Sequence, residues 1–382
     1  SWSKLTEIKD CYSMKRKNEL FPGQEPVKHL TSPSEPKMTT KILNGLENIR
    51  DTTLSRYILT GQATHPEARG DLSLLLNGVQ VACKIIESCV RRAGIAQLYG
   101  LAGSGNVQGE DQKKLDIIAN DIFKENVEST QKVCVMVSEE EDLAIVCEPA
   151  FGSAKYAIAF DPLDGSSNID ANVSIGTIFS IFKIKHPEQV KTAEDAKKAI
   201  LQPGRDMVVA GYCMFGSATN LVLTFKDSNV NGFTLDNTVG EFLLTHPNIQ
   251  IPKKGKIYSV NEGNASLWDE STRKFIEGLK FPTDGSKPYS ARYIGSMVAD
   301  VHRTLLYGGI FIYPSDSKSK SGKLRLLYEA APMAMIMENA GGAATTGKQR
   351  ILDVVPDGIH IRVPVFMGSS EEVAKIVELY KH

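Results

Sequence analysis

The stretch FDPLDGSS at residues 160–167 is the most informative part of the chain. It follows the apolar run YAIAF at 156–160, which predicts a buried strand, so the stretch should form the turn where that strand ends. Its proline stiffens the turn and its glycine releases it, and two carboxylates three residues apart, Asp161 and Asp164, can then point at one cation. The N–H groups and serine hydroxyl that follow can bind an anion. The stretch therefore predicts a loop at which a metal ion and a phosphate group meet.

Two other interpretations of this stretch stay open at this point. Asp, Pro, Gly and Ser dominate ordinary turns, so the pattern is also typical of a turn that binds nothing. A calcium loop is a further possibility, although the stretch lacks the alternating Asp or Asn positions and the terminal Glu of an EF-hand. The choice depends on whether other acidic residues accompany the motif.

Acidic residues also stand at the ends of other predicted elements. The pair Glu139 and Glu140 follows a predicted strand at 134–137, and adjacent carboxylates on a structured edge repel each other unless a cation holds them. Each acidic motif also has a more ordinary explanation. The pair could be a solvated acidic turn. Asp116 stands near the start of a predicted helix and could cap it, and Glu329 follows two cationic residues with which it could form an ion pair.

A site built from these motifs would offer oxygen ligands. No His or Cys cluster accompanies the acidic residues, and oxygen ligands favour Mg²⁺ or Mn²⁺ over zinc. Two such ions beside one phosphate ester would activate a water molecule and neutralise the charge that develops on the phosphoryl oxygens and the leaving alkoxide. The acidic motifs therefore favour a metal-dependent phosphatase.

The composition is that of an ordinary globular protein. Of 382 residues, 42% are hydrophobic and 23% charged, which is enough apolar surface to form a large core. A net charge of −1 gives no reason to expect binding to nucleic acid or to an anionic membrane, and we find no apolar run near the roughly 18 residues of a membrane span. The six cysteines form no CxxC pair, which favours a reducing compartment, the cytoplasm, over a zinc site or a disulfide framework.

Helix and strand signals are mixed along the chain. The segment Lys15–Thr40, rich in Lys, Pro, Glu and Ser, has no apolar period and is interpreted as an extension. We expect helices from Leu72, with Asp71 as cap, and at 112–126, 297–307 and 328–339, and strands at 134–137, 156–160, 175–184, 208–215, 256–260 and 309–313, with a hairpin of 220–225 and 233–235 around 226–229. Without a strict βαβ alternation, this pattern predicts layered sheets and helices rather than a Rossmann domain or a TIM barrel.

Taken together, the motifs resemble the fructose-1,6-bisphosphatase family, a branch of the lithium-sensitive sugar and inositol phosphatases. The resemblance extends from about Thr53 to Leu379. It is carried, in the family's order, by SEE at 138–140, DPLDGSSNID at 161–170, SVNEG at 259–263, ARYIGSM at 291–297, YGG at 307–309 and GKLRLLYE at 322–329.

This resemblance implies a fold and an activity. The fold would be an α/β/α/β/α sandwich with mixed sheets, preceded by an extension at 1–45 and divided into a regulatory, metal-binding half at 46–245 and a catalytic, sugar-phosphate-binding half at 246–382. The activity would be hydrolysis of the 1-phosphate of D-fructose 1,6-bisphosphate in gluconeogenesis, by a homotetramer with two or three Mg²⁺ per subunit, for which Mn²⁺ could substitute. Sedoheptulose-1,7-bisphosphatase, a broader inositol-phosphate phosphatase and a non-catalytic sugar-phosphate sensor are the alternatives.

The resemblance also implies roles for individual residues. The metal ligands would be Glu139, Asp161, Asp164, Glu329 and the carbonyl of Leu163. Two further acids beside the metals, Glu140 and Asp116, would act with Asp161 in catalysis by orienting or deprotonating the attacking water. The reacting phosphate would be held by Gly165 and Ser166, with Arg325 close by. The remaining substrate contacts, to the second phosphate and the sugar, would come from Asn261, Tyr293, Tyr313, Lys323, Met297 and, across a subunit boundary, Arg292.

Regulation is the part of the resemblance from which the chain departs most. The positions that correspond to the AMP site of animal members are Ser73, Lys155, Tyr156 and Lys183. The Lys-Tyr pair is kept, but a lysine replaces the arginine whose two-pronged contact holds phosphate, so we expect weak or absent AMP sensitivity. No cysteine lies between residues 177 and 212, which argues against the thioredoxin switch of plastid members. Two other departures are Glu110-Asp111, where members often carry Asp, and Asn264, which replaces a tyrosine.

Overall fold

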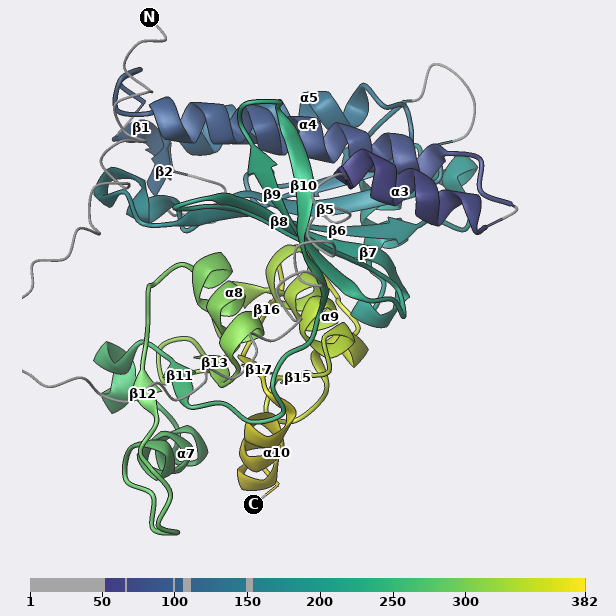
Figure 1. Ribbon diagram of the computed structural model, residues 1–382. Helices are drawn as coiled ribbons and strands as arrows, with labels where there is room; N and C mark the ends of the chain where they lie inside the picture. Colours follow the sequence, from purple (N-terminus) through teal and green to yellow (C-terminus); the bar gives the residue numbers. More distant parts are fainter. Residues whose placement is uncertain (1–51, 66, 99, 106–110, 149–153, 382) are drawn as a thin grey trace, which may run out of the picture. The chain divides into compact units, whose positions relative to one another are not determined.

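Figure 1 shows the computed structural model, which describes residues 52–65, 67–98, 100–105, 111–148 and 154–381. The predicted extension over 1–45 and Glu110 lie outside the described residues. In the described part, helices and sheets alternate in five layers, and three clusters of buried apolar side chains join successive layers. The predicted α/β/α/β/α arrangement is therefore confirmed.

An eight-stranded sheet is the larger of the two main sheets in the described part of the chain. Its strands, in spatial order, are β10 (Glu241–Ile249), β9 (Val230–Asp236), β8 (Thr219–Phe225), β7 (Met207–Phe215), β6 (Ile175–Lys183), β5 (Tyr156–Asp164), β3 (Val133–Ser138) and β4 (Ile145–Val146). Neighbours are antiparallel except β3 and β5, which run parallel, and β8–β9 confirms the predicted hairpin. The parallel pair brings the C-terminal ends of β3 and β5 to one edge.

Both faces of this sheet are buried. Along β6, Phe179 and Ile181 belong to one apolar cluster and Ile178 and Phe182 to another, because successive side chains of a strand point to opposite faces. The first face is covered by α3 (Leu54–Ala63), α4 (Asp71–Arg92) and α5 (Lys114–Glu128). The second face is covered by α8 (Met297–Tyr307) and α9 (Ala331–Asn339), which lie between the two sheets.

Helix α4 begins one residue earlier than predicted, and the prediction that Asp71 caps it is wrong. Gly70 is the N-cap, with a φ of 83°, and Asp71 is the first helical residue. Its carboxylate pairs with Lys132 Nζ at 3.1 Å and with Lys155 Nζ at 2.5 Å. The carboxylate is therefore engaged with two lysines instead of capping the helix. Among the described helices, α4 has the length and apolar content of a membrane span, but half of that window is buried against the protein, as in a core helix.

The second main sheet has five strands. They are, in spatial order, β12 (Ser290–Ala291), β11 (Ile257–Ser259), β13 (Ile310–Tyr313), β17 (Val365–Gly368) and β15 (Ala343–Thr345). Its outer face is covered by α7 (Glu270–Lys280) and α10 (Ser370–Leu379). The glycine pair of the YGG motif allows β11 and β13 to approach closely, because a Cβ on Gly309 would lie 2.0 Å from Ile257 O.

The remaining elements connect these layers. They are the helix α6 (Ala193–Ile200), the short strand pairs β1 (Leu101–Gly105) with β2 (Asp111–Lys113) and β14 (Leu324–Arg325) with β16 (Arg362–Val363), and the 3₁₀ turns η2 (Ser166–Ala171), η3 (Pro187–Gln189), η4 (Gly204–Asp206), η5 (Glu262–Leu267) and η7 (Ile351–Asp353). The predicted helix at 328–339 begins as a π-helical turn, η6 (Leu326–Ala330), and continues as α9. π-Helical turns are rare in proteins, and those that occur are often found at functional sites.

Candidate active site

Four acidic side chains converge at the C-terminal ends of β3 and β5. Asp161 and Asp164 lie at the end of β5, and Glu139 directly follows β3, where its N–H donates to Phe160 O at 3.1 Å. Glu329 comes from the π-helical turn η6. Ligand oxygens of Asp161, Asp164 and Glu329 all lie within 4.8 Å of one another, and all four side chains are buried. The two halves of the sequence thus contribute to one cluster.

This carboxylate cluster is electrostatically unfavourable as it stands. Burial raises the pKa of Asp161 well above its usual value, and the neighbouring carboxylates raise it further. Burial also raises the pKa of Asp164 to about 7, although the Val298 N–H donates to its Oδ2 at 3.0 Å and lowers it. The pKa of Glu329 is raised by burial as well, despite the lowering effect of a nearby guanidinium. Desolvation and mutual repulsion therefore both oppose ionisation.

Arg325 supplies the positive charge beside this cluster. Its Nη1 lies 2.9 Å from Glu139 Oε1 and 3.8 Å from Glu329 Oε1. The backbone N–H of Arg325 also donates to Glu329 Oε2. One guanidinium does not balance four carboxylates, and buried charges are stable only when they are paired or coordinate a metal. Divalent cations would supply the missing charge.

The donor atoms fit a hard divalent cation. The cluster offers carboxylate oxygens, the ligands that Mg²⁺ and Mn²⁺ prefer. Nearby, Asp116 of α5 is buried, and its Oδ1 has no hydrogen-bond partner among the described residues. Burial raises the pKa of Asp116 to about 6, with Glu139 adding to this, while the Lys113 N–H, which donates to Oδ2 at 2.8 Å, lowers it. A buried oxygen of this kind is suited to a water molecule or an ion.

The predicted turn connects this cluster to a possible anion site. Asp161 Oδ1 accepts from the Leu163 N–H at 2.9 Å, which fixes the carboxylate against its own turn. Gly165 has a φ of 79°, and a Cβ there would lie 3.0 Å from Ser296 Oγ, so a side chain would be both strained and crowded. Ser166 begins the turn η2. The turn therefore requires glycine at this position, where its backbone packs against Ser296.

A short hydrogen-bond chain holds the remaining predicted acid. The Glu140 N–H donates to Ser138 Oγ at 3.2 Å, and Ser138 donates to Asn120 Oδ1 of α5 at 2.7 Å. Asn120 in turn donates to Glu141 Oε1 at 3.0 Å. The half-buried Glu140 is thus fixed through its backbone to the helix that carries Asp116.

The residues predicted for the second phosphate lie in the C-terminal half. Tyr293 follows β12 and is 37% exposed. Partial desolvation raises its pKa, and the Tyr313 hydroxyl and the Asp300 and Asp164 carboxylates add to this. The other predicted contacts are Asn261 at the end of β11, Arg292 after β12, Met297 at the start of α8 and Lys323 before β14. Asn261, Arg292 and Lys323 are exposed, whereas Met297 is buried.

The predicted effector residues Ser73 and Lys155 contact other side chains of the N-terminal half rather than the carboxylate cluster. Ser73 donates to Gln62 Oε1 at 2.5 Å, and Lys155 forms the ion pair with Asp71. Tyr156 and Lys183 face each other across β5 and β6, and the Lys183 side chain is exposed. Asp71 thus places a carboxylate against the lysine that would have to bind an anion.

Asp300, which accepts several hydrogen bonds in this region, was not predicted from the sequence. Asp300 lies in the first turn of α8 and is fully buried. An acidic residue in the first turn of a helix is common, because its charge interacts favourably with the helix dipole. The sequence position alone therefore does not indicate another role. The available signal was its position three residues after the ARYIGSM motif.

The structure is a layered sandwich with buried carboxylates at the ends of two parallel strands, next to a glycine turn. This arrangement is that of a metal-dependent phosphatase. The family model "Fructose-1-6-bisphosphatase, N-terminal domain" matches residues 52–247, and the model for the C-terminal domain matches residues 251–381. The chain therefore belongs to the fructose-1,6-bisphosphatase family, and the resemblance noted from its motifs is confirmed.

Relatives and solved structures agree with this assignment. The cytosolic fructose-1,6-bisphosphatase of Oryza sativa subsp. indica is 60% identical over 328 residues, which cover 86% of this chain and 95% of the relative. The cytosolic fructose-1,6-bisphosphatase of Spinacia oleracea is 58% identical over 86% of this chain and 94% of the relative. The crystal structure of Leishmania major fructose-1,6-bisphosphatase in holo form matches with a TM-score of 0.82 at 49% identity, over 87% of this chain and 99% of that one.

Proposed function

We propose that this protein is a cytosolic fructose-1,6-bisphosphatase that hydrolyses the 1-phosphate of D-fructose 1,6-bisphosphate in gluconeogenesis. The observation that carries the proposal is the convergence of the Asp161, Asp164 and Glu329 oxygens within 4.8 Å, beside the turn at Gly165. The family membership supports the choice of substrate, and relatives that are named cytosolic enzymes support the compartment.

The cofactor would be two or three Mg²⁺ per subunit, with Mn²⁺ as a possible substitute. The ligands would be Glu139, Asp161, Asp164 and Glu329, with the Leu163 carbonyl as a further oxygen donor. When bound, these ions would neutralise charge on the phosphoryl group and on the leaving oxygen and would activate water. The raised pKa values of the buried carboxylates support this assignment, because bound cations would stabilise the ionised carboxylates and so offset the effects of burial and mutual repulsion.

The chain's own residues would bind the reacting phosphate and manage the proton. The Gly165 and Ser166 N–H groups and the Ser166 hydroxyl would donate to the phosphate, with Arg325 close by. Asp116, whose pKa burial raises to about 6, would orient the attacking water or take its proton, together with Glu140.

The second phosphate would be held at a distance from the reaction. Lysine, arginine and tyrosine hydroxyl donors suit a phosphate that does not react, because they fix the substrate without breaking a bond. These contacts would be Asn261, Arg292, Tyr293, Tyr313 and Lys323, with Met297 against the sugar.

Assembly and organisation follow the family in this proposal. The chain would form a homotetramer in which Arg292 reaches the substrate of a neighbouring subunit. Residues 46–245 would form a regulatory, metal-binding half and 246–382 a catalytic, sugar-phosphate-binding half. Sedimentation of the purified protein tests the tetramer directly. A monomer that retains full activity would contradict it.

Phosphate release from the purified protein tests the activity. We expect release from fructose 1,6-bisphosphate that depends on added Mg²⁺ and stops with a chelator. Comparison of kcat/KM for fructose 1,6-bisphosphate, sedoheptulose 1,7-bisphosphate and an inositol phosphate should favour the first. No release from any of them would leave a sugar-phosphate sensor, and a higher kcat/KM for another substrate would replace the proposal.

A further inference from the structure

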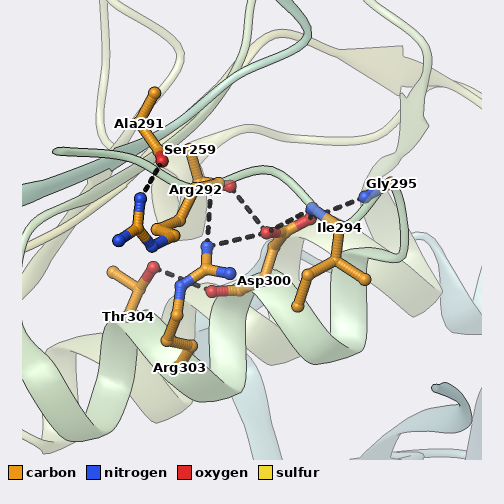
Figure 2. A network of polar contacts seen from close by, with 8 residues as sticks. All are labelled: Ser259, Ala291, Arg292, Ile294, Gly295, Asp300, Arg303 and Thr304. Carbon is orange, nitrogen blue, oxygen red and sulfur yellow. Dashed lines mark hydrogen bonds and ion pairs between the residues drawn. The ribbon is translucent and has the colours of Figure 1, made fainter. Parts of the chain in front are cut away.

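The loop that carries Arg292 and Tyr293 is held in shape by one buried carboxylate (Figure 2). Asp300 is 0% exposed. The Ile294 N–H donates to its Oδ1 at 3.1 Å and to its Oδ2 at 3.0 Å, and the Gly295 N–H donates to its Oδ2 at 3.0 Å. The Ser259 hydroxyl at the end of β11 donates to Asp300 Oδ1 at 2.8 Å. One side chain therefore joins α8, the second sheet and the loop.

Arg303, one turn further along α8, reinforces this arrangement. Its Nη2 donates to Asp300 Oδ1 at 2.7 Å and also to Arg292 O at 2.8 Å (Figure 2). The Arg303 side chain is 16% exposed and that of Asp300 is fully buried, so the pair is largely desolvated and its charge-assisted hydrogen bonds are strong. The carboxylate and the guanidinium together fix the backbone on both sides of Tyr293.

The two ends of the loop are attached to different parts of the proposed active site. At its start, the Arg292 N–H donates to Tyr258 O at 2.9 Å, which connects the loop to the edge of the second sheet. At its end, Gly295 O accepts from Asn168 Nδ2 at 3.1 Å, and the Val298 N–H donates to Asp164 Oδ2 at 3.0 Å. The loop therefore spans from the carboxylate cluster to the sheet that carries Asn261.

We propose that Asp300 is a positioning residue that sets the distance between the carboxylate cluster and the Arg292–Tyr293 donors, so that the enzyme favours sugar bisphosphates over monophosphates. This inference rests on the proposed function, because it takes those two residues as ligands of the second phosphate. Asp300 itself touches no substrate. Its role is to accept hydrogen bonds from the N–H groups of Ile294 and Gly295 and so to hold the loop against α8.

The physical reason is the number of donors that meet at one acceptor. Two backbone N–H groups, a hydroxyl and a guanidinium converge on Asp300, and an amide in its place would turn an NH₂ group toward donors. The loop would then have to shift to satisfy them. A displacement of about 1 Å in substrate-positioning groups can lower a rate on the order of a hundredfold.

The test is Asp300→Asn, assayed with two substrates that share the reacting phosphate. Fructose 1,6-bisphosphate carries the second phosphate and fructose 1-phosphate lacks it. We expect kcat/KM for the bisphosphate to fall about tenfold to a hundredfold, mainly through KM, and kcat/KM for the monophosphate to change less than about threefold. The inhibition constant of fructose 6-phosphate, which carries the second phosphate, should rise in the variant. The inhibition constant of inorganic phosphate should remain unchanged.

Matched variants separate positioning from general destabilisation. Asp353→Asn removes an exposed carboxylate that pairs with Arg205 and Arg350 on another surface, and it should leave the ratio of the two substrates unchanged. If Asp300→Asn does not fold, Ser259→Ala and Arg303→Lys keep the carboxylate and should shift the ratio in the same direction by a smaller factor.

The failures of the two proposals can be told apart. An equal loss with both substrates, or an unchanged ratio in a folded and active variant, would overturn the positioning role and leave the proposed function intact. If the unaltered protein hydrolysed neither substrate in Mg²⁺, the proposed function would fail, and this inference with it.

Discussion

Asp300 and Asp161 are both buried carboxylates, but their surroundings are opposite. Asp300 is 0% exposed and accepts hydrogen bonds from backbone N–H groups, a hydroxyl and a guanidinium, all supplied by the C-terminal half. Asp161 is 2% exposed and faces other carboxylates, which raise its pKa further above the usual value. One site is satisfied by the chain itself, and the other requires a partner from outside.

This difference separates a positioning acid from a ligand acid by a physical criterion. A buried carboxylate with enough donors is a stable part of the fold, whereas clustered carboxylates remain charged only with added positive charge. Burial alone does not distinguish them, since both are almost fully inaccessible to water. The number and charge of the groups that face each oxygen does.

Removal of the uncompensated acid should have the largest effect on turnover. We expect Asp161→Asn to lower kcat by about a thousandfold or more, because it removes a proposed metal ligand, while the protein remains folded. Glu140→Gln should also abolish turnover, since it removes a proposed proton acceptor. Steady-state kinetics and circular dichroism check both, with Asp353→Asn as the control. Turnover within tenfold of the unaltered protein would contradict the proposed role of the cluster.

Stability should respond in the opposite order. Asp300→Ala leaves the Ser259 hydroxyl and two N–H groups without an acceptor and removes the carboxylate that pairs with Arg303, so it should lower the free energy of unfolding by about 3 kcal/mol. In metal-free buffer, Asp161→Asn should be neutral or stabilising, because it relieves repulsion. Urea denaturation in the presence of chelator measures both changes. Equal destabilisation by the two substitutions would remove the distinction between the two sites.

Added metal should stabilise the fold through the carboxylate cluster, because the chain does not supply enough positive charge to balance it. At a hundredfold excess over the dissociation constant, Mg²⁺ should raise the free energy of unfolding by about 2.7 kcal/mol for one site, seen as a higher melting temperature. Glu329→Gln should lose most of this gain, whereas Asp353→Asn should keep it. Differential scanning fluorimetry with and without chelator provides the measurement. The same gain in Glu329→Gln would show that Mg²⁺ binds elsewhere.

The sequence predicted the acids of the cluster but not the network around Asp300, for a physical reason. Asp161 and Asp164 are close in the chain and stand in a turn with Pro and Gly, so local chemistry predicts them. Asp300 receives its donors from Ser259 on another strand and from Ile294 in the preceding loop, and such convergence follows from the tertiary fold. Pattern reasoning of one segment at a time does not reveal it.

The same limit applies to the fold. The helix predicted at 297–307 is confirmed at both ends, since an apolar period there is followed by two glycines. The strand predicted at 156–160 continues through the DPLD turn to Asp164, because pairing with β6 carries it past the proline. Helix α7 (Glu270–Lys280) was not predicted, because its few apolar residues sit among many charges and acquire a partner only from the second sheet.

Asp71 provides the smallest and most selective test, because it lies between the two extremes. It is partly exposed and is paired with cations of its own chain. Burial acts to raise its pKa, but the hydrogen bonds from Lys155 and Lys132 outweigh burial, so the pKa lies below the usual value of 3.8. A folded-state pKa below the unfolded value stabilises the fold above about pH 4, and this contribution is lost as the pH falls through the folded-state pKa.

Asp71→Asn should therefore cost about 1 kcal/mol at pH 7, and the difference from the unaltered protein should shrink toward zero below about pH 4. Urea denaturation at a series of pH values gives the difference. Lys155→Met should lose less, because Lys132 still pairs with Asp71, and the double variant should lose no more than Asp71→Asn alone, because that substitution already removes both ion pairs. A difference that stayed constant from pH 7 to pH 3 would mean that the carboxylate acts through packing or helix geometry. In that case pairing with its own chain would not be what makes this acid favourable, and the contrast between Asp300 and Asp161 would need another explanation.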